Sequence, residues 1–370
     1  MTLRIALVHP HSWPDVRRGG ERYLDDLAWY LARHDHHVTV ITAGTGPLSE
    51  HVGDHGVMVR SHRSRGGGRL RRWGMTADEA FFPSALADLR RHRFDLVHAL
   101  VPAAGLAARL TRHRTVYTVI GHPTRAELAD RPVASRIFRA AVRSATVAAA
   151  LSHASAANVA ELFGRQPEVL PPGTRIESFP PDLEPRSGPP RLLFSAHNED
   201  RRKGLDVLMG AMPAVLDRHP EARLRLSGAG DPSWALATLG ADHDRVRAAV
   251  EVMGAGDLAD VPGRYRAATV TVLPARDEAF GLALVESLAS GTPVVCSDDG
   301  GMPEIVNDPA IGRTVPLGDG RALAAAIDET IALAALDATP PACAARARAF
   351  SWDDAVGPRH EAVYEEALRR

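Results

Sequence analysis

The chain has 370 residues, of which 45% are apolar and 24% are charged, and its formal net charge is −1. This length and composition indicate a soluble globular protein of two domains of roughly 150–200 residues each, and the near-neutral charge argues against a nucleic-acid partner. Cys296 and Cys343 show neither C-x-x-C nor metal-ligand spacing, which fits a reducing compartment. Neither a signal peptide nor an apolar stretch of ~20 residues is recognisable, so we expect a cytoplasmic protein that does not span a membrane.

Short apolar stretches alternate with amphipathic ones from one end of the chain to the other. In the first half, five stretches are typical of strands: residues 3–9, 37–42, 94–99, 115–119 and 146–150. Residues 21–34 have helical spacing, with Tyr23, Leu27 and Tyr30 on one face. In the second half the strand pattern returns at residues 191–196, 222–227, 269–273, 293–297 and 313–316. Apolar strands separated by helices predict parallel sheets that are covered on both faces.

A proline-rich stretch divides the two halves. Residues 170–190 contain seven prolines, which can continue neither a helix nor a central strand. We therefore predict an α/β fold with two doubly wound, Rossmann-like domains that face a cleft, at residues 1–175 and 186–350, and a last segment at 351–370. Ligands bind outside the carboxyl ends of the strands in such sheets, so the cleft between the domains is the expected site.

An arginine-rich segment interrupts the first half. Six arginines from Arg60 to Arg72 surround the glycines at 66–68. Charged, glycine-rich segments usually stay unordered, which favours a solvated loop. The alternative is a basic lip that meets an anionic acceptor or a membrane surface.

Lys203 is the only lysine in the chain, against 43 arginines, and it stands just before a predicted helix. A lysine ammonium is a compact point charge that suits a phosphate near a helix N-terminus, where backbone N–H groups and the helix dipole favour an anion. The alternative is compositional, because one lysine can survive by chance in an arginine-rich chain. The position of Lys203 alone leaves both interpretations open.

The most specific pattern runs from Glu278 through Phe280 and Gly281 to Glu286. A predicted strand ends just before this run and a helix begins near Gly281, so the free N–H groups of Gly281, Leu282 and the next residue point at a diphosphate site at the strand's carboxyl end. Gly281 lets the backbone approach a ligand closely. Glu278 and Glu286 flank this cradle and can accept hydrogen bonds from ribose and sugar hydroxyls. The alternative is a solvated helix face, which a second glycine-rich loop after the next strand makes less plausible.

These motifs together resemble the donor-binding signature of the retaining glycosyltransferases of family 4, which have the GT-B fold. The motifs are, in chain order, Gly19-Gly20, Pro172-Gly173 with Phe179, Arg202-Lys203-Gly204, the run from Glu278 to Glu286, Gly291-Thr292-Pro293 and Gly300-Gly301. The resemblance covers nearly the whole chain and is most specific in the second half. It implies a first domain that binds the acceptor, a second domain that binds a nucleoside diphosphate sugar, and a last helix that crosses back onto the first domain.

The resemblance also implies a role for each matching residue. Glu286 is expected to hold the nucleotide ribose, and Glu278 the hydroxyls of the donor sugar. Lys203 is expected to contact the diphosphate, and Gly19 and Gly20 to pack against it from the first domain. The functional interpretation of Lys203 is therefore favoured over the compositional one. The nucleotide-binding set is completed by Phe280, Gly281, Leu282 and Arg201.

The chain departs from the family pattern at two positions. The usual arginine five residues before the lysine is Asn198 here, so either Arg201 or Arg202 is expected to supply the second positive charge. The family often has a histidine in a Thr-Val-His-Gly run, whereas the run at 118–122 has its histidine, His122, two positions later. His122 either serves the same site or caps a turn before the following proline. The candidate catalytic residues are Lys203, Glu278, Arg202 and His122.

We therefore expect an enzyme that moves a sugar from a nucleoside diphosphate sugar, of UDP or GDP type, to a small-molecule, glycan or lipid-linked acceptor, without a metal or a separate cofactor. Lys203, the arginines beside it and the helix end at Gly281 would stabilise the leaving diphosphate. Asp298 and Asp299 are adjacent carboxylates without a His or Cys partner, and we interpret them as loop surface and not as a metal site.

Two other functions stay open. One is a nucleotide-sugar epimerase of similar two-domain fold, which an acceptor-independent change in the donor sugar would reveal. The other is a non-catalytic nucleotide- or glycan-binding module, which would bind a nucleotide without turnover.

Overall fold

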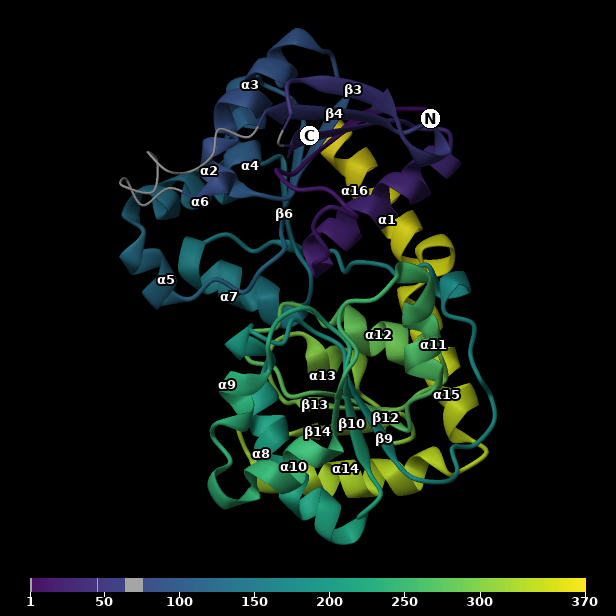
Figure 1. Cartoon of the computed structure of the whole chain (residues 1–370). Helices are drawn as coiled ribbons and strands as arrows, with labels where there is room; N and C mark the ends of the chain where they lie inside the picture. The colour runs from purple at the N-terminus through teal and green to yellow at the C-terminus, as the bar shows by residue number, and fades with distance from the viewer. Residues whose placement is uncertain (1, 45, 64–75) are drawn as a thin grey trace. The chain divides into compact units, whose positions relative to one another are not determined.

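The computed structural model describes residues 2–44, 46–63 and 76–370, and the chain divides into two compact units (Figure 1). Unit 1 contains Met1–Gly173 and Trp352–Arg370, and unit 2 contains Thr174–Ser351. The chain thus leaves unit 1 at position 173 and returns to it at position 352, near the boundaries at 175 and 350 that the sequence suggests.

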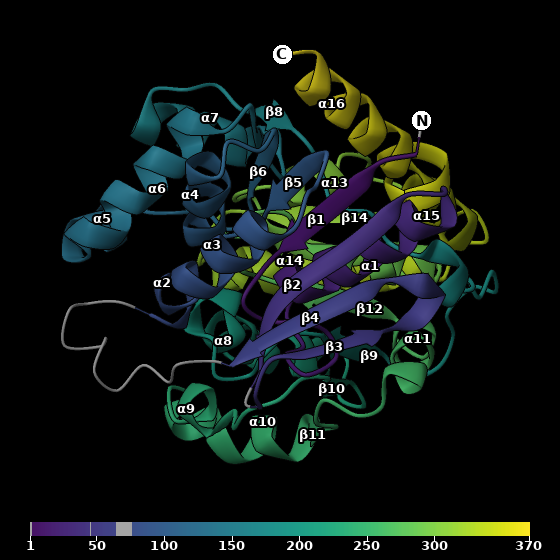
Figure 2. The same ribbon diagram turned by 90° about the horizontal axis from the view of Figure 1, so that it is seen from above.

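Unit 1 is built on an eight-stranded sheet of order β3-β4-β2-β1-β5-β6-β7-β8, in which only β3 and β4 are antiparallel neighbours. The strands are β1 (Arg4–Val8), β2 (His37–Gly44), β3 (Ser49–Val52), β4 (Met58–Arg63), β5 (Leu96–Ala99), β6 (Thr115–Val119), β7 (Val147–Ala150) and β8 (Glu168–Val169). Helices α3 (Phe82–Arg91), α4 (Pro102–Leu110) and α6 (Pro132–Ser144) cover one face, and α1 (Gly19–Arg33) with α16 (Gly357–Arg369) covers the other (Figure 2). The shorter helices are α2 (Ala77–Ala80), α5 (Arg125–Asp130) and α7 (His153–Phe163).

Unit 2 is built on a six-stranded, wholly parallel sheet of order β11-β10-β9-β12-β13-β14. The strands are β9 (Arg191–Phe194), β10 (Arg223–Leu226), β11 (Val250–Val252), β12 (Val270–Leu273), β13 (Val294–Ser297) and β14 (Gly312–Val315). The helices are α8 (Leu205–Arg218), α9 (Ser233–Leu236), α10 (His243–Ala249), α11 (Val261–Arg266), α12 (Leu282–Ala289), α13 (Met302–Ile305), α14 (Gly320–Ala334) and α15 (Thr339–Ala347). The chain order reverses between β9 and β12, and ligands of doubly wound sheets bind at the carboxyl ends of the two strands at such a reversal.

The predicted α/β fold with two parallel-sheet halves is confirmed, and all ten predicted strands are present to within two residues at each end. The four strands that the sequence pattern misses are β3, β4, β8 and β11. They are exposed, polar or only two to four residues long, except for β4, which begins with two apolar residues and continues with four polar ones. The predicted helix at 21–34 is α1, which buries Tyr23, Leu27 and Tyr30 as the spacing predicts.

The predicted solvated loop at 60–72 is wrong for its first residues, because Arg60 to Arg63 belong to β4. The Arg60 guanidinium lies 3.2 Å from the Asp88 carboxylate, and His62 Nε2 lies 2.8 Å from the other oxygen of that group. The Arg60 side chain is only 14% exposed, so its charge serves the fold and not an outer surface. Positions 64–72 of the predicted loop lie outside the described residues.

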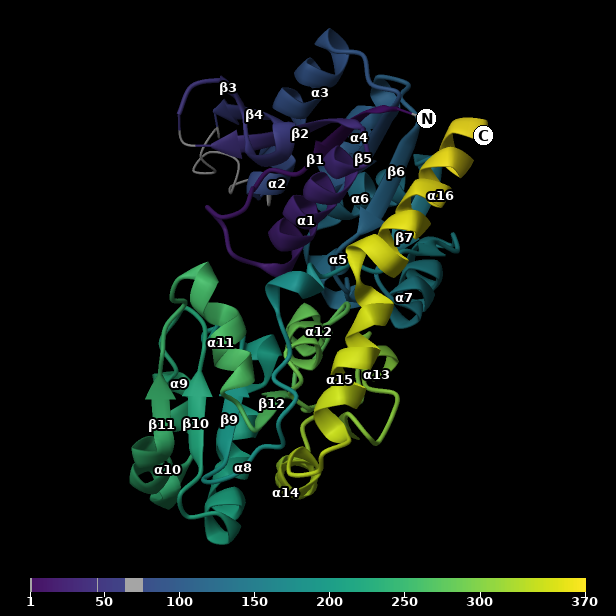
Figure 3. The same ribbon diagram turned by 90° about the vertical axis from the view of Figure 1, so that its right-hand side faces the viewer.

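The C-terminal segment completes the core of unit 1. Trp352 stacks on Tyr23 and Tyr30, with ring centroids 6.0 and 5.8 Å apart. Glycines allow this contact, because a Cβ on Gly173 would lie 2.6 Å from the Trp352 ring and one on Gly357 would lie 2.1 Å from the Tyr30 ring. After Trp352 the helix α16 lies against α1, β5 and β6 (Figure 3).

A buried polar network fixes α16 at this place. His360 Nδ1 donates to the Val356 carbonyl, so its Nε2 is the acceptor for the Tyr23 hydroxyl at 2.8 Å. The ring nitrogens of His98 lie 2.7 Å from the hydroxyls of Tyr364 and Thr118. Burial lowers the pKa of His360 to about 4 and the pKa of His98 well below its usual range, so both rings are neutral in the folded protein.

We expect acid to destabilise unit 1 through these histidines. An unfolded histidine has a pKa near 6.5, so below that pH the unfolded chain binds protons that the folded His360 does not. The stability that neutral His360 contributes is therefore complete above pH 6.5 and is lost as the pH falls towards 4, by about 3 kcal/mol. Thermal unfolding followed by tryptophan fluorescence between pH 7.5 and 4.5 measures the effect.

The variant His360→Gln removes one titrating group and should flatten this pH dependence. His243→Gln is the matched control, because His243 is half exposed and pairs with the exposed Asp244. A pH slope that is the same in the parent and in His360→Gln would contradict the expectation.

Candidate functional site

Three loops of unit 2 meet at one edge of its sheet. Strands β9, β12 and β13 are parallel neighbours, so the loops that follow them, at 195–204, 274–281 and 298–301, leave the sheet at the same edge. The first two loops flank the point where the chain order reverses. Most of the residues singled out in the second half of the sequence lie on these loops.

Lys203 and Glu278 form an ion pair at this edge, with Nζ and Oε2 2.5 Å apart. Their side chains are 23% and 16% exposed, so the pair is largely shielded but still open to solvent. Lys203 ends a short 3-10 helix, Arg201–Lys203, and Gly204 follows it with a φ of +72°. The left-handed turn at Gly204 lets α8 begin directly after the lysine.

The loop after β12 is held between two glycine turns. A Cβ on Gly204 would lie 1.9 Å from the Pro274 carbonyl oxygen, and a Cβ on Gly300 would lie 2.0 Å from the Glu278 carbonyl oxygen. Both contacts are with backbone atoms that cannot move aside, so no other residue fits either position. The Glu278 carbonyl also accepts a hydrogen bond of 2.9 Å from the Gly301 N–H group.

A carboxylate holds the middle of this loop. Asp277 has a φ of +53°, a left-handed conformation that costs free energy in residues other than glycine. Its N–H group donates to Asp299 Oδ2 over 2.5 Å. Asp299, which we interpreted as loop surface, is therefore a partner that keeps Asp277, and with it the adjacent Glu278, in place.

Glu286 lies in α12, whose first turn follows Gly281 at a φ of +109°. The Tyr265 hydroxyl donates to Glu286 Oε2 over 2.8 Å and lies 2.9 Å from Ser195 Oγ. Sequence reasoning missed Tyr265, because a tyrosine with helical spacing in α11 reads as an ordinary core residue. It is fully buried, and its role in orienting the Glu286 carboxylate is evident only from the hydrogen bond that its hydroxyl group makes.

The other residues of the predicted nucleotide-binding set differ in what they can offer. The Phe280 side chain is 4% exposed and packs edge-on against Phe350, so only its backbone is available to a ligand. Gly281 and Leu282 stand at the start of α12, where backbone N–H groups without a helical partner face the sheet edge.

The polar and charged residues just before Lys203 have partners of their own. Asn198, at the position of the family's arginine, is fully buried, and its Nδ2 donates to the carbonyls of Gly228 and Gly230. The Arg201 guanidinium stacks over the Trp234 ring at 4.7 Å. The Arg202 guanidinium donates to Asp200 Oδ2 over 2.7 Å. The geometry therefore directs neither arginine to the Lys203–Glu278 pair.

In unit 1, the glycine pair and the histidine lie on neighbouring loops. A Cβ on Gly20, at the start of α1, would lie 2.8 Å from Ile120 Cδ1, which joins the Gly19-Gly20 turn to the loop that carries His122. Thr124 and Glu127 form the capping box of α5, so His122 does not cap that helix. His122 Nδ1 is buried and has no hydrogen-bond partner among the residues that the structure describes.

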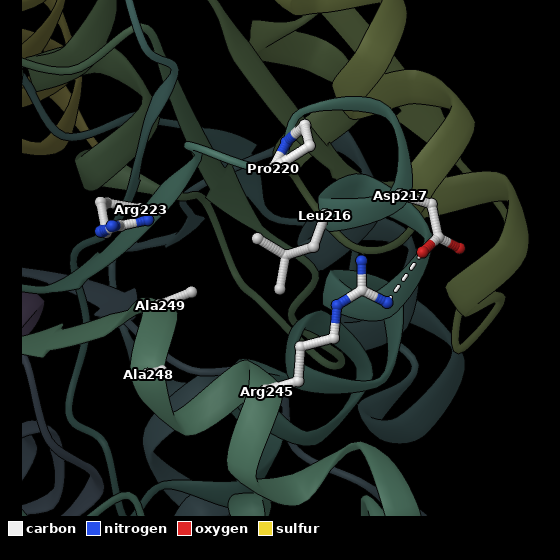
Figure 4. Close-up of a pocket in the computed structure, with 7 residues that line it drawn as sticks. All are labelled: Leu216, Asp217, Pro220, Arg223, Arg245, Ala248 and Ala249. Carbon is white, nitrogen blue, oxygen red and sulfur yellow. Dashed lines mark ion pairs between the residues drawn. The ribbon is translucent and has the colours of Figure 1, made fainter.

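A cavity of about 380 Å³ lies elsewhere in unit 2 (Figure 4). It is lined by the end of α8, the start of β10 and the end of α10, and Arg245 in its wall pairs with Asp217 at 2.7 Å. The start of β10 is at the amino edge of the parallel sheet, so this cavity is opposite to the Lys203–Glu278 edge and is not the predicted nucleotide site.

The described ranges, 2–44, 46–63 and 76–370, lack two kinds of feature. They contain no helix long and apolar enough to cross a membrane. They also contain no group of three or more His, Cys, Asp or Glu side chains placed to hold a metal ion.

Comparisons with known proteins match both halves of the chain. Residues 17–178 match the family described as Glycosyltransferase Family 4, and residues 189–332 match the family described as Glycosyl transferases group 1. Together these matches cover most of the chain.

Individual relatives and structures agree with the family matches. The chain is 27% identical to a phosphatidyl-myo-inositol mannosyltransferase of Mycobacterium tuberculosis over 85% of this chain and 83% of the relative, and 34% identical to that of Mycobacterium leprae over 45% of each. It is 32% identical to a D-inositol 3-phosphate glycosyltransferase of Acidothermus cellulolyticus over 58% of this chain and 51% of the relative, so the last two matches span about half of each relative. The fold is similar to that of sucrose-phosphate synthase from Thermosynechococcus elongatus, with a TM-score of 0.80, 24% identity and 99% of each chain covered.

We expect Asp299→Ala to loosen the loop at 274–281, because it removes the acceptor for the Asp277 N–H group. A hydrogen bond to a charged group contributes about 1.5–3 kcal/mol, so amide exchange in this loop should become at least about 10-fold faster. Hydrogen–deuterium exchange with mass spectrometry measures the change. Adding Asp277→Gly should restore part of the protection, because glycine adopts the left-handed conformation without strain.

Asp298→Ala is the matched control, because Asp298 is the exposed neighbour of Asp299 on the same turn. If Asp298→Ala and Asp299→Ala alter the exchange of the loop equally, the Asp277–Asp299 hydrogen bond does not hold it.

Proposed function

Because the chain belongs to glycosyltransferase family 4 and has the GT-B fold, we propose that it transfers a sugar from a nucleoside diphosphate sugar to an acceptor with retention of anomeric configuration. The observation that carries the proposal is the Lys203–Glu278 pair beside Glu286 at one edge of the unit 2 sheet. One cation for phosphates and two carboxylates for hydroxyls are the groups that a nucleoside diphosphate sugar requires.

Each of these groups has a separate part in binding the donor. Glu286, which Tyr265 orients, accepts hydrogen bonds from the ribose hydroxyls. Glu278 accepts them from the hydroxyls of the sugar. Lys203 binds the diphosphate, so donor binding exchanges the Lys203–Glu278 pair for a phosphate on the lysine and a hydroxyl on the glutamate.

The chemical step that needs most help is departure of the diphosphate. Negative charge grows on its oxygens as the bond to the sugar breaks, and fixed positive charge at that place lowers the barrier. Lys203 and the N–H groups at the start of α12 supply this charge, so the proposed reaction requires no metal ion. Unit 1 binds the acceptor, and the unpaired His122 Nδ1 is its candidate polar contact.

The names of the relatives support one class of acceptor. Two relatives are named for phosphatidyl-myo-inositol and D-inositol 3-phosphate, and both compounds contain an inositol ring that bears a phosphate ester. We therefore propose a phosphorylated inositol, free or linked to a lipid, as the acceptor. Screening UDP-, GDP- and ADP-sugars with these acceptors would identify the base and the sugar of the donor.

The two carboxylates should fail in different ways. Glu286→Gln should weaken binding of the free nucleoside diphosphate by about 1.5–3 kcal/mol, which is the loss of a hydrogen bond to a charged group. Glu278→Gln should leave binding of the free nucleotide nearly unchanged and should lower turnover of the sugar donor. Calorimetry with UDP, GDP and ADP, followed by kinetics with the matching sugar donor, separates the two effects.

Glu329→Gln serves as the matched control, since Glu329 pairs with Arg313 on the exposed side of α14. Variants Glu278→Gln and Glu286→Gln that bind and turn over like the parent would show that the carboxylates have other roles. A sugar that changes without any acceptor would identify an epimerase instead.

Activity should survive removal of divalent metal ions, because side chains and a helix end supply the positive charge. The measurement is the initial rate with the preferred donor and acceptor, before and after treatment with EDTA. A complete loss of activity that Mg²⁺ or Mn²⁺ reverses would overturn this part of the proposal. It would make Asp298 and Asp299 candidate metal ligands.

A further inference from the structure

The charge of Lys203 is already neutralised by a protein group. Its Nζ lies 2.5 Å from Glu278 Oε2, and the pair as a whole carries no net charge. A nucleoside diphosphate carries more than one negative charge, and the charge on its outer phosphate increases as the sugar departs. A site that offers only this neutral pair and a helix end therefore lacks a cation whose charge is not already balanced.

The two arginines next to Lys203 do not meet this need. Arg201 stacks on Trp234. Arg202 is neutralised by Asp200 over 2.7 Å. To reach a phosphate, Arg201 would have to leave an aromatic ring and Arg202 a carboxylate.

Arg276 is the remaining cation on the two loops, 195–204 and 274–281. Its side chain is exposed and makes no ion pair, hydrogen bond or ring contact with any part of the chain that the structure describes. Its backbone N–H group donates to the Arg202 carbonyl over 2.7 Å, so its Cα is fixed beside the turn that carries Lys203. It also stands two residues before Glu278.

The backbone under Arg276 is fixed on both sides. Gly204 contacts Pro274 on one side, and Asp299 and Gly301 hold Asp277 and Glu278 on the other. Because the backbone is fixed, only the Arg276 side chain has to be ordered when a phosphate binds, which costs less entropy than ordering a loose loop as well. Arginine also offers a planar fork that matches two oxygens of one phosphate.

We infer that Arg276 is a phosphate-binding residue that supplies the second positive charge to the outer phosphate of the donor. The inference deepens the proposed function and rests on it. It places the second positive charge on the loop after β12, whereas the family resemblance suggests Arg201 or Arg202 on the loop after β9.

Nucleotide binding tests the inference without turnover. Calorimetry with UDP and UMP, and with GDP and GMP, gives the ratio of monophosphate to diphosphate Kd, which measures the contribution of the outer phosphate. In Arg276→Gln the diphosphate should bind about 10- to 100-fold more weakly, while the monophosphate changes by less than about threefold. Arg276→Lys should keep part of the preference, and Lys203→Ala should show a loss of similar size.

Arg247→Gln is the matched control, because Arg247 is another exposed arginine of unit 2, in α10 and away from these loops. An unchanged ratio in Arg276→Gln would overturn the inference, and a ratio that collapses only in Arg202→Gln would overturn it in favour of that residue. A parent protein that binds none of UDP, GDP and ADP would instead contradict the proposed function, so the two failures are distinguishable.

Discussion

Two steric contacts between backbone segments position the groups of the unit 2 site. At Gly204 and at Gly300 the chain passes so close to a neighbouring carbonyl oxygen that a Cβ would lie 1.9 or 2.0 Å from it. The loop after β12 is the neighbour in both cases, so its backbone is restrained at both Pro274 and Glu278. Hydrogen bonds from Asp277 and to Glu278 then fix its conformation. These contacts set the backbone positions from which the side chains of the loop extend.

This construction explains how one short loop can hold opposite charges close together. Glu278 on this loop pairs with Lys203 on the loop after β9. Arg276, two residues before Glu278, donates its backbone N–H group to the carbonyl of Arg202, the residue before Lys203. A mobile loop would let these charges rearrange or turn to solvent. A fixed loop keeps them close to the place where a ligand's hydroxyls and phosphates need them, which is what preorganised electrostatic stabilisation requires.

The fold was predictable from sequence, and candidate residues for a site were recognisable from it for a different physical reason. Apolar runs of strand length, such as 115–119, indicate strands that are buried on both faces of a sheet. Lys203, Glu278 and Glu286 are recognisable because their spacing around glycines matches a known signature. Tyr265 was not predictable, because its hydroxyl matters only after α11 and α12 pack together.

Other features depended on contacts that are distant in sequence. Arg60 reads as part of a solvated, basic run, yet Asp88 captures it inside unit 1. The partners of Arg201 and Arg202 could not be assigned, since Trp234 lies far along the chain and Asp200 is one of several nearby acids. A local pattern reports the tendency of a segment to be buried or exposed, and it does not identify which distant residue will meet a given charge.

The return of the chain to unit 1 at Trp352 has a consequence for biosynthesis. The ring of Trp352 and helix α16 are part of the unit 1 core, but the ribosome makes them after the whole of unit 2. Unit 2 is continuous and can fold as soon as it emerges, since domains generally fold as units during synthesis. Unit 1 has to wait, with the Tyr23 and Tyr30 surfaces uncovered, until the segment that covers them has been translated. The first half of this chain therefore stays without its complete core for longer during synthesis than the second half does.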